Sequence, residues 1–443
     1  MPSYLLHLQL ENSISSLISR DCSVFSMSGS FSRYRPGTQV PHEPQRPSSS
    51  PPSNTFVSLN IPQVDILRPF SDSMTSQLPN ETLFAILEHL QSNTLIPVLR
   101  VSRRFQAIAE RILYANICIV ETLPRSSPVP YATACCFKTL LDRPHLSEVV
   151  KRISIRWQTE SGPREQYMPY VEPVLETMNR ALRSLTALET LELAFGLSGG
   201  TISSRGILEG CSFPALRLFS LSGVGRGSLN PKTHPTPTPP IEWFLSETPS
   251  IQHLRLADCH ETLELQPSDL PFLTTFRGSA PTAASVLPGR PVQLLSLVGH
   301  EFVTQRDLER IACSSARIRW LDLSSMSVTP ILLRDISRHL FGVEYLKLKL
   351  ALRHTLHHAL SGISLLAGLT SVLGAFPELY QLDLSPTNID AISPGNAAEE
   401  AQLCTTWARG CPSLRHIVFP SKIEWILNEQ DMWIPQAGSP PSH

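Results

Sequence analysis

The sequence predicts an α/β protein in which a small N-terminal helical bundle precedes a solenoid of strand–helix repeats, with a parallel concave sheet and outer helices. Three observations predict this fold: apolar residues at helical spacing, a recurring strand pattern, and helical segments between its copies. The expected divisions are a disordered Ser/Pro-rich head at 1–75, the bundle at 76–119, the solenoid at 120–428 with an inserted Pro-rich loop near 225–240, and a flexible tail at 429–443.

Serine and proline dominate the head. Residues 1–77 contain 18 serines and 9 of the 39 prolines of the chain, and such a segment buries too little apolar surface to offset chain entropy. Met74 stands just before the first ordered-looking element, so translation starting at Met1 and translation starting at Met74 both remain open.

The composition excludes several function classes. Lys and Arg number 37 against 38 Asp and Glu, and a nucleic-acid binder needs a basic excess, so we expect no nucleic-acid partner. The nine cysteines are scattered without a CxxC pair, which favours reduced thiols in the cytoplasm or nucleus. No apolar stretch reaches the roughly 18–20 residues of a membrane helix, so we expect no membrane partner.

The bundle begins with the segment LPNETLFAILEHL. Its Leu83, Ile86, Leu87 and Leu90 recur at i, i+3, i+4 and i+7, which predicts one apolar face of a helix. The following segment, NTLIPVLRVSRRFQAIAERILYANI, predicts further short helices. A bundle of this size lies near the lower limit for independent stability, so we expect it to pack against a partner or the rest of the chain.

The order L-P-x-E-x-L-x-x-I-L-x-x-L, followed by V-S-x-x-F and L-Y, resembles the F-box. The resemblance implies docking onto a Skp1-like adaptor and, through it, onto a cullin. The chain departs from the family at Asn93-Thr94, where an acidic or small residue is usual, and at Pro97 inside the second helix. The positions that the resemblance assigns to Skp1 binding are Leu78, Pro79, Ile86, Leu87, Leu95, Val101, Ser102 and Phe105.

The solenoid is predicted from ten copies of the pattern apolar-x-x-apolar-x-apolar. The copies begin at Val150, Leu188, Leu216, Ile251, Leu273, Val292, Ile318, Val343, Leu379 and Leu414, the fifth being the weakest. Helical stretches lie between them at 241–250, 307–316, 331–342, 365–378 and 397–413. Helix-then-strand units each expose an apolar face, and they must stack to bury it.

The ladder is similar to the leucine-rich repeats (LRR) of F-box/LRR proteins, in a degenerate, fungal-type form. Its chief rival is a doubly wound α/β domain, which also alternates strands and helices. The rival predicts longer buried strands and a glycine-rich phosphate turn, and neither is evident.

Side chains between the apolar strand positions point to the opposite face of the sheet. Aromatic residues among charges of both signs suit a surface that recognises a target protein. The candidates for target binding are Arg156, Glu192, Arg255, Trp320, Asp322, Tyr345, Lys347, Lys349, Gln381 and Asp383.

Three motifs resemble catalytic, phosphate-binding or metal-binding patterns, but each lacks a part that its chemistry needs. Ser198 stands in a GxSxG match, but glycines follow where a nucleophile elbow needs a helix. Residues 223–228 fail GxGxxG at the last position. His354, His357 and His358 share a helical face without a nearby cysteine or acidic cluster. We therefore expect no catalytic residue, no cofactor and no metal site.

Together these features predict a non-catalytic substrate-recognition subunit of an SCF-type (Skp1–cullin–F-box) E3 ubiquitin ligase. Its F-box would bind Skp1, and its repeats would bind a target protein whose identity the sequence does not encode. The alternative is an F-box-like LRR scaffold that acts in protein–protein interaction without ligase activity. A third hypothesis is an enzyme that uses Ser198 as its nucleophile.

Overall fold

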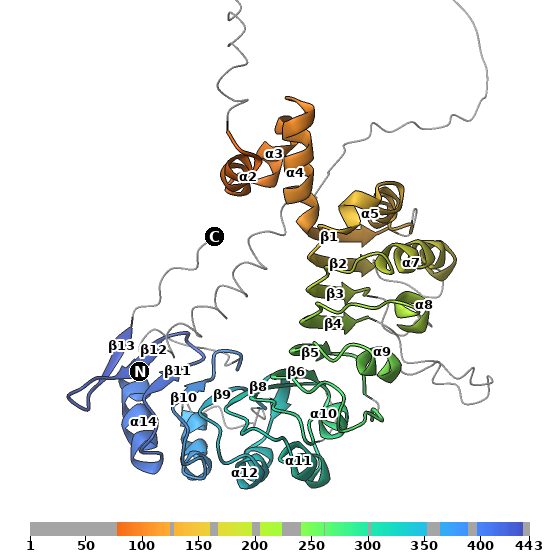
Figure 1. Ribbon diagram of the computed structural model, residues 1–443. Coiled ribbons are helices and arrows are strands. Elements are labelled where there is room, and N and C mark those ends of the chain that lie inside the picture. The colour runs from red at the N-terminus through yellow and green to blue at the C-terminus, as the bar shows by residue number, and fades with distance from the viewer. Residues whose placement is uncertain are drawn as a thin grey trace, which may run out of the picture. The chain divides into compact units, whose positions relative to one another are not determined.

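The computed structural model describes residues 78–124, 128–159, 167–196, 204–223, 241–260, 262–299, 303–351, 364–388 and 397–436. Within these ranges the chain divides into a helical unit at 78–112 and a repeat unit at 113–436 (Figure 1). The expected head and the Pro-rich loop near 225–240 lie outside the described residues.

The helical unit contains α2 (Asn80–Glu88), α3 (Ser92–Val98) and the first ten residues of α4 (Arg103–Ala115). Helix α4 begins after Ser102, whose Oγ accepts a hydrogen bond from the Phe105 N–H at 3.3 Å. A serine in this position satisfies one of the unpaired N–H groups at a helix start. The buried apolar residues of the unit are Leu83, Leu87, Leu95, Ile108 and Ala109.

The repeat unit is built on one sheet whose described strands follow one another in sequence order. The strands are β1 (Asn116–Leu123), β2 (Arg152–Thr159), β3 (Thr190–Ala194), β4 (Leu218–Ser222), β5 (His253–Leu256), β6 (Thr275–Gly278), β7 (Leu294–Val298), β8 (Trp320–Val328), β9 (Tyr345–Leu350), β10 (Gln381–Asp383), β11 (His416–Val418), β12 (Glu424–Leu427) and β13 (Trp433–Gln436). Strands β1–β11 pair in parallel, whereas β12 and β13 pair antiparallel. A doubly wound sheet reverses its strand order, so this order identifies a solenoid.

Helices follow the strands and line the outer side of the curved sheet (Figure 1). They are α5 (Tyr131–Asp142), α6 (Pro144–Ser147), α7 (Met168–Leu182), α8 (Ser204–Leu208), α9 (Glu242–Ser246), α10 (Ala280–Val286), α11 (Gln305–Ile311), α12 (Pro330–His339), the 3-10 helix η3 (Ser364–Leu369), α13 (Thr370–Leu373) and α14 (Ala397–Gly410). We call the opposite side of the sheet the inner face.

The ten expected strands occur as β2–β11, and the parallel register aligns their apolar residues. Leu191, Phe219, Leu254 and Phe276 are consecutive partners across β3–β6, and each is fully buried. The first residue of each pattern precedes its strand and is buried too, as Val343 is before β9. One continuous core therefore runs between the sheet and the helices.

Three strands lie outside the expected pattern and correct two boundaries. The expected bundle end at residue 119 falls inside β1, because the alternating Ile117 and Ile119 pair in register with Ile153 and Ile155 of β2. The expected flexible tail from residue 429 includes β13, which completes a hairpin with β12.

A buried arginine joins neighbouring repeats. The side chain of Arg290 is 2% exposed, and it follows α10 just before β7. Its guanidinium donates to the carbonyl oxygens of Gln266 and Asp269, both at 2.8 Å, and also to that of Val286. Burial lowers the pKa of this group, and the carbonyls that surround it supply the acceptors that water would otherwise provide.

Replacing Arg290 by methionine is expected to lower the free energy of unfolding by about 3 kcal/mol or more, because several buried carbonyls lose their donor. Urea denaturation of the full chain measures the change as a lower midpoint. The exposed Arg306 on α11 provides the matched control, and Arg306→Met is expected to stay within about 0.5 kcal/mol of the wild type. Equal midpoints for the two variants would show that the Arg290 contacts do not stabilise the fold.

Candidate binding surfaces

The helical unit exposes a large share of its apolar residues. Ile86 on α2 is 51% exposed, and Val101 before α4 is 66% exposed. The exposed large hydrophobic residues of this unit are Leu78, Phe84, Ile86, Leu90, Ile96 and Val101. Burying a side chain of this size gains roughly 1.5–3 kcal/mol, so a partner that covers several of them would bind favourably.

The expected adaptor-binding residues fall into two groups. Leu78, Pro79, Ile86, Val101 and Ser102 are exposed, and Phe105 is half-buried. Leu87 and Leu95, by contrast, are 5% and 1% exposed and belong to the core of the unit.

The structure corrects the expectation for Leu87 and Leu95. The apolar positions of α2 divide between two directions: Leu83 and Leu87 point into the bundle, whereas Ile86 and Leu90 are exposed. Spacing alone places all four on one broad face and does not separate its two edges.

Arg104 fixes the position of this surface. Its Nε donates to Asn80 Oδ1 at 2.8 Å, and its Nη2 donates to the Leu78 carbonyl oxygen. These bonds tie the start of α2 to α4, so they hold the exposed Leu78 and Pro79 against the rest of the unit. The sequence pattern gave no sign of this arginine, nor of Phe84 and Ile96 as exposed apolar positions.

The sheet of the repeat unit carries the expected target-binding residues. All ten occupy positions that alternate with buried residues, so they lie on the inner face. Nine of them are partly or fully exposed, whereas Asp383 is 6% exposed. Many of these side chains already have partners on the neighbouring strands, which limits what they offer to another molecule.

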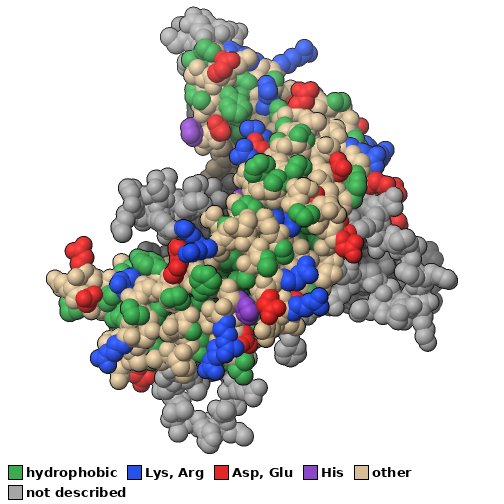
Figure 2. All heavy atoms as spheres, turned by 60° about the horizontal axis from the view of Figure 1, so that its bottom comes forward, with side chains coloured by type: hydrophobic (Ala, Val, Ile, Leu, Met, Phe, Trp, Pro, Cys, Tyr) green, Lys and Arg blue, Asp and Glu red, His purple; other side chains and the backbone are tan. Residues whose placement is uncertain are grey.

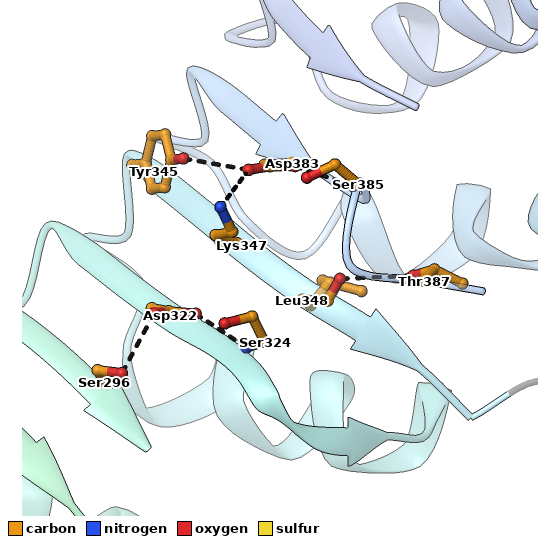
Figure 3. A network of polar contacts seen from close by, with 9 residues as sticks. All are labelled: Ser296, Asp322, Ser324, Tyr345, Lys347, Leu348, Asp383, Ser385 and Thr387. Carbon is orange, nitrogen blue, oxygen red and sulfur yellow. Dashed lines mark hydrogen bonds and ion pairs between the residues drawn. The ribbon is translucent and has the colours of Figure 1, made fainter. Parts of the chain in front are cut away.

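Figure 3 shows the polar network that spans β7–β10. Lys347 Nζ lies 3.0 Å from Asp383 Oδ2, and Tyr345 OH donates to the same oxygen at 3.5 Å. On β8, Asp322 Oδ2 accepts a hydrogen bond from Ser296 Oγ at 3.2 Å. The network therefore links adjacent repeats across the inner face.

Both aspartates of the network also accept a hydrogen bond from the backbone two residues further on, Asp322 inside β8 where the register with β9 shifts and Asp383 at the end of β10. Asp322 Oδ1 accepts from the Ser324 N–H at 2.8 Å, and Asp383 Oδ1 accepts from the Ser385 N–H at 2.9 Å. The same four residues, LDLS, occur at 321–324 and 382–385. These carboxylates thus have a structural role, whereas the sequence predicts that they bind the target.

Two further pairs occupy the same face. The rings of Trp320 and Tyr345 stack, with centroids 3.3 Å apart and planes 14° apart. Arg255 Nη1 lies 3.5 Å from Glu192 Oε1, across the strand between them. The paired groups are partly exposed, and Figure 2 shows hydrophobic, basic and acidic side chains interspersed over the surface that it draws.

Among the described residues, Arg156, Lys349 and Gln381 make no side-chain hydrogen bond or ion pair. Two inner-face arginines lie outside the expected set. Arg152 on β2 makes no side-chain hydrogen bond or ion pair within the described ranges, and Arg277 on β6 donates there only to Ser325 Oγ at 3.0 Å. The apolar pattern is weakest at β6, which is why its inner position was overlooked. The alternation Thr275-Phe276-Arg277 was the available signal.

The glycine motifs begin at positions with positive φ. Gly196, the first glycine of GxSxG, has a φ of +59°, and a Cβ there would lie 2.4 Å from the Trp157 carbonyl oxygen. Gly223 has a φ of +72°, and a Cβ there would lie 2.3 Å from the Gly196 nitrogen. Both positions require glycine for backbone conformation and close approach. Ser198, His354, His357 and His358 lie outside the described residues.

Within the described ranges, no three His, Cys, Asp or Glu side chains are grouped so that they could hold a metal ion. None of the described helices is long and apolar enough to span a membrane.

Neighbouring cysteines on α5 have different surroundings. Cys135 is exposed, whereas burial raises the pKa of the Cys136 thiol to about 12. The reactive species of a thiol is the thiolate, so a shift from 9.0 to about 12 reduces that species on the order of a thousandfold near neutral pH. The pair does not form a disulfide in the structure.

Iodoacetamide near neutral pH is expected to modify Cys135 in the folded chain and to modify Cys136 at least about a hundredfold more slowly. Peptide mapping by mass spectrometry measures both rates in one sample. In guanidinium chloride the two residues are expected to react alike, because unfolding exposes both. Equal rates in the folded chain would contradict the partly buried position of Cys136.

One comparison with known proteins bears on the helical part of the chain. Residues 75–120 match the family model described as F-box-like. A search of curated proteins found no match. Among solved structures, the chain is similar to an internalin (InlF) of Listeria monocytogenes, with 13% identity, a TM-score of 0.27, and coverage of 68% of this chain and 90% of the internalin. Residues 75–120 thus match an F-box-like domain, and the strand order of the residues that follow is that of a parallel αβ solenoid.

Proposed function

We propose that this protein is the substrate-recognition subunit of an SCF-type E3 ubiquitin ligase, with no catalytic role of its own. The helical unit binds a Skp1-like adaptor and, through it, a cullin. The inner face of the repeat unit binds the target protein. The chain contributes positioning, since it brings a target close to an enzyme carried elsewhere in the complex.

The observation that carries the proposal is the exposed apolar surface of the F-box-like domain. Ile86, Ile96 and Val101 are all more than 40% exposed in a unit of three short helices. Solvated apolar side chains at this density mark an interaction site. F-box domains generally bind Skp1-like adaptors, and residues 75–120 match that family.

The inner face supports the second half of the proposal. It presents the stacked Trp320 and Tyr345 beside charged side chains of both signs, and aromatic residues of this kind are enriched where proteins recognise one another. Pairing with side chains on neighbouring strands holds these residues in place, so they form a rigid base for contacts with a target.

Purified full chain is expected to capture recombinant Skp1, and Ile86→Asp with Val101→Asp is expected to reduce the affinity at least about tenfold. The reason is that each substitution places a carboxylate in a surface that binding dehydrates. Biolayer interferometry with immobilised Skp1 measures the affinity. Both residues are exposed in the structure, so the variant should fold, and circular dichroism checks this.

Ile331→Asp is the matched control, because Ile331 is an isoleucine 73% exposed on α12 of the repeat unit. It is expected to leave capture unchanged. The proposal fails if the wild-type chain captures no Skp1, or if the control loses as much affinity as the double variant. Capture of Skp1 without assembly of a cullin in size-exclusion chromatography would favour the ligase-independent scaffold.

A further inference from the structure

Charge is distributed unevenly along the inner face. Strands β2, β5 and β6 place four arginines there, and Glu192 is the single acidic residue that the described strands β1–β6 add to this face. The four arginines are Arg152, Arg156, Arg255 and Arg277. Strands β7–β12 instead place charges of both signs on this face: Lys347, Lys349, Asp322, Asp383 and Glu424.

The acidic groups near the arginines are already engaged. Glu192 pairs with Arg255 at 3.5 Å. Asp258, in the turn after β5, accepts a hydrogen bond from the Gly223 N–H at 2.5 Å. Among the described residues, Arg255 alone of the four arginines has a carboxylate partner, and Arg152, Arg156 and Arg277 have none.

Arg156 and Arg277, which lie toward opposite ends of this half of the face, both have N–H donors to spare. A guanidinium carries five N–H donors, and Arg277 uses one of its groups on the neutral Ser325 hydroxyl. Arg156 is exposed and makes no side-chain hydrogen bond within the described ranges. Charge-assisted bonds from arginine to carboxylate are stronger than bonds between neutral groups, so an acidic side chain is the ligand that both positions favour.

Small side chains lie between these arginines. In the register of the sheet, Ala194 and Ser222 follow Arg156 across β3 and β4, and Ser220 lies between Glu192 and Arg255. The short side chains of Ala194 and Ser222 let a peptide backbone come close to the sheet next to Arg156, and farther along it would cross above the Glu192–Arg255 pair, which spans Ser220.

We propose that this half of the inner face binds an extended acidic segment of the target protein, with one Asp or Glu on Arg156 and another on Arg277. The inference rests on the proposed function, since it assumes that the inner face receives a target. The two arginines are four strand spacings apart, or about 19 Å at ~4.8 Å per spacing. An extended peptide rises ~3.3 Å per residue, so the two acidic residues are about six positions apart.

Selection of a phage-displayed library of random 12-residue peptides on the purified full chain tests this. The expected result is enrichment of peptides with two Asp or Glu residues spaced by five to seven positions. A synthetic peptide from the enriched pool is expected to lose at least tenfold in affinity when both acids become Asn or Gln, measured by fluorescence anisotropy. Its binding should also weaken with added salt.

Variants of the chain locate the site. Arg156→Gln with Arg277→Gln is expected to lose at least tenfold in affinity for the enriched peptide. The single change Arg277→Gln has Lys349→Gln as its matched control. Lys349→Gln also removes one positive charge that has no carboxylate partner among the described residues, but it does so in the β7–β12 half of the inner face. It should leave the affinity for the enriched peptide within twofold of the wild type. Selection of basic or uncharged peptides, or equal losses in the arginine and lysine variants, would overturn the proposal.

The experiment separates this proposal from the function on which it rests. Ile86→Asp with Val101→Asp alters the helical unit alone, so it should abolish Skp1 capture and leave peptide affinity unchanged. The arginine variants should retain Skp1 capture. Loss of peptide selection with intact Skp1 capture would thus reject the acidic segment and leave the adaptor role standing.

Discussion

Every repeat depends on the parallel register of its strands with those of its neighbours. A strand of three to nine residues cannot bury its own apolar side chains, and an isolated strand–helix unit would expose them. The register places Leu295, Leu321 and Leu346 as direct partners on three adjacent strands, where all are buried. Stability is therefore shared between neighbours, and the irregular lengths of the connecting segments matter less than the positions at which each strand begins.

The same register decides which inner-face residues are available to a partner. Residues at equivalent positions on adjacent strands are close enough to pair, so Lys347 meets Asp383 and Trp320 meets Tyr345. Such pairs make the face rigid, but they also consume donors and acceptors. Arg156 and Lys349 are left over next to the small side chains of Ala194 and Ser327.

The sequence predicted the fold well because the fold depends on a pattern. The ten strands β2–β11 follow from spacing alone, whereas β1 was missed because Asn116–Leu123 continues directly from α4 and carries no copy of the full pattern. The candidate surfaces were predicted less completely. Leu87 and Ile86 are neighbours in the sequence with similar side chains, yet one is core and the other surface, and only the packing of α2 against α3 and α4 distinguishes them.

Gly196 and Gly223 have a consequence for how this protein can diversify. They occupy equivalent places after β3 and β4, and the backbone at Gly223 lies directly against Gly196. Each glycine closely follows its strand in a conformation that favours glycine, and the sequence from there to the next strand is long. Insertions and deletions beyond such a point leave the strand register untouched. Natural variation in length is therefore expected to accumulate there while the ladder of buried residues stays constant, so new loop surfaces can arise without a cost in stability.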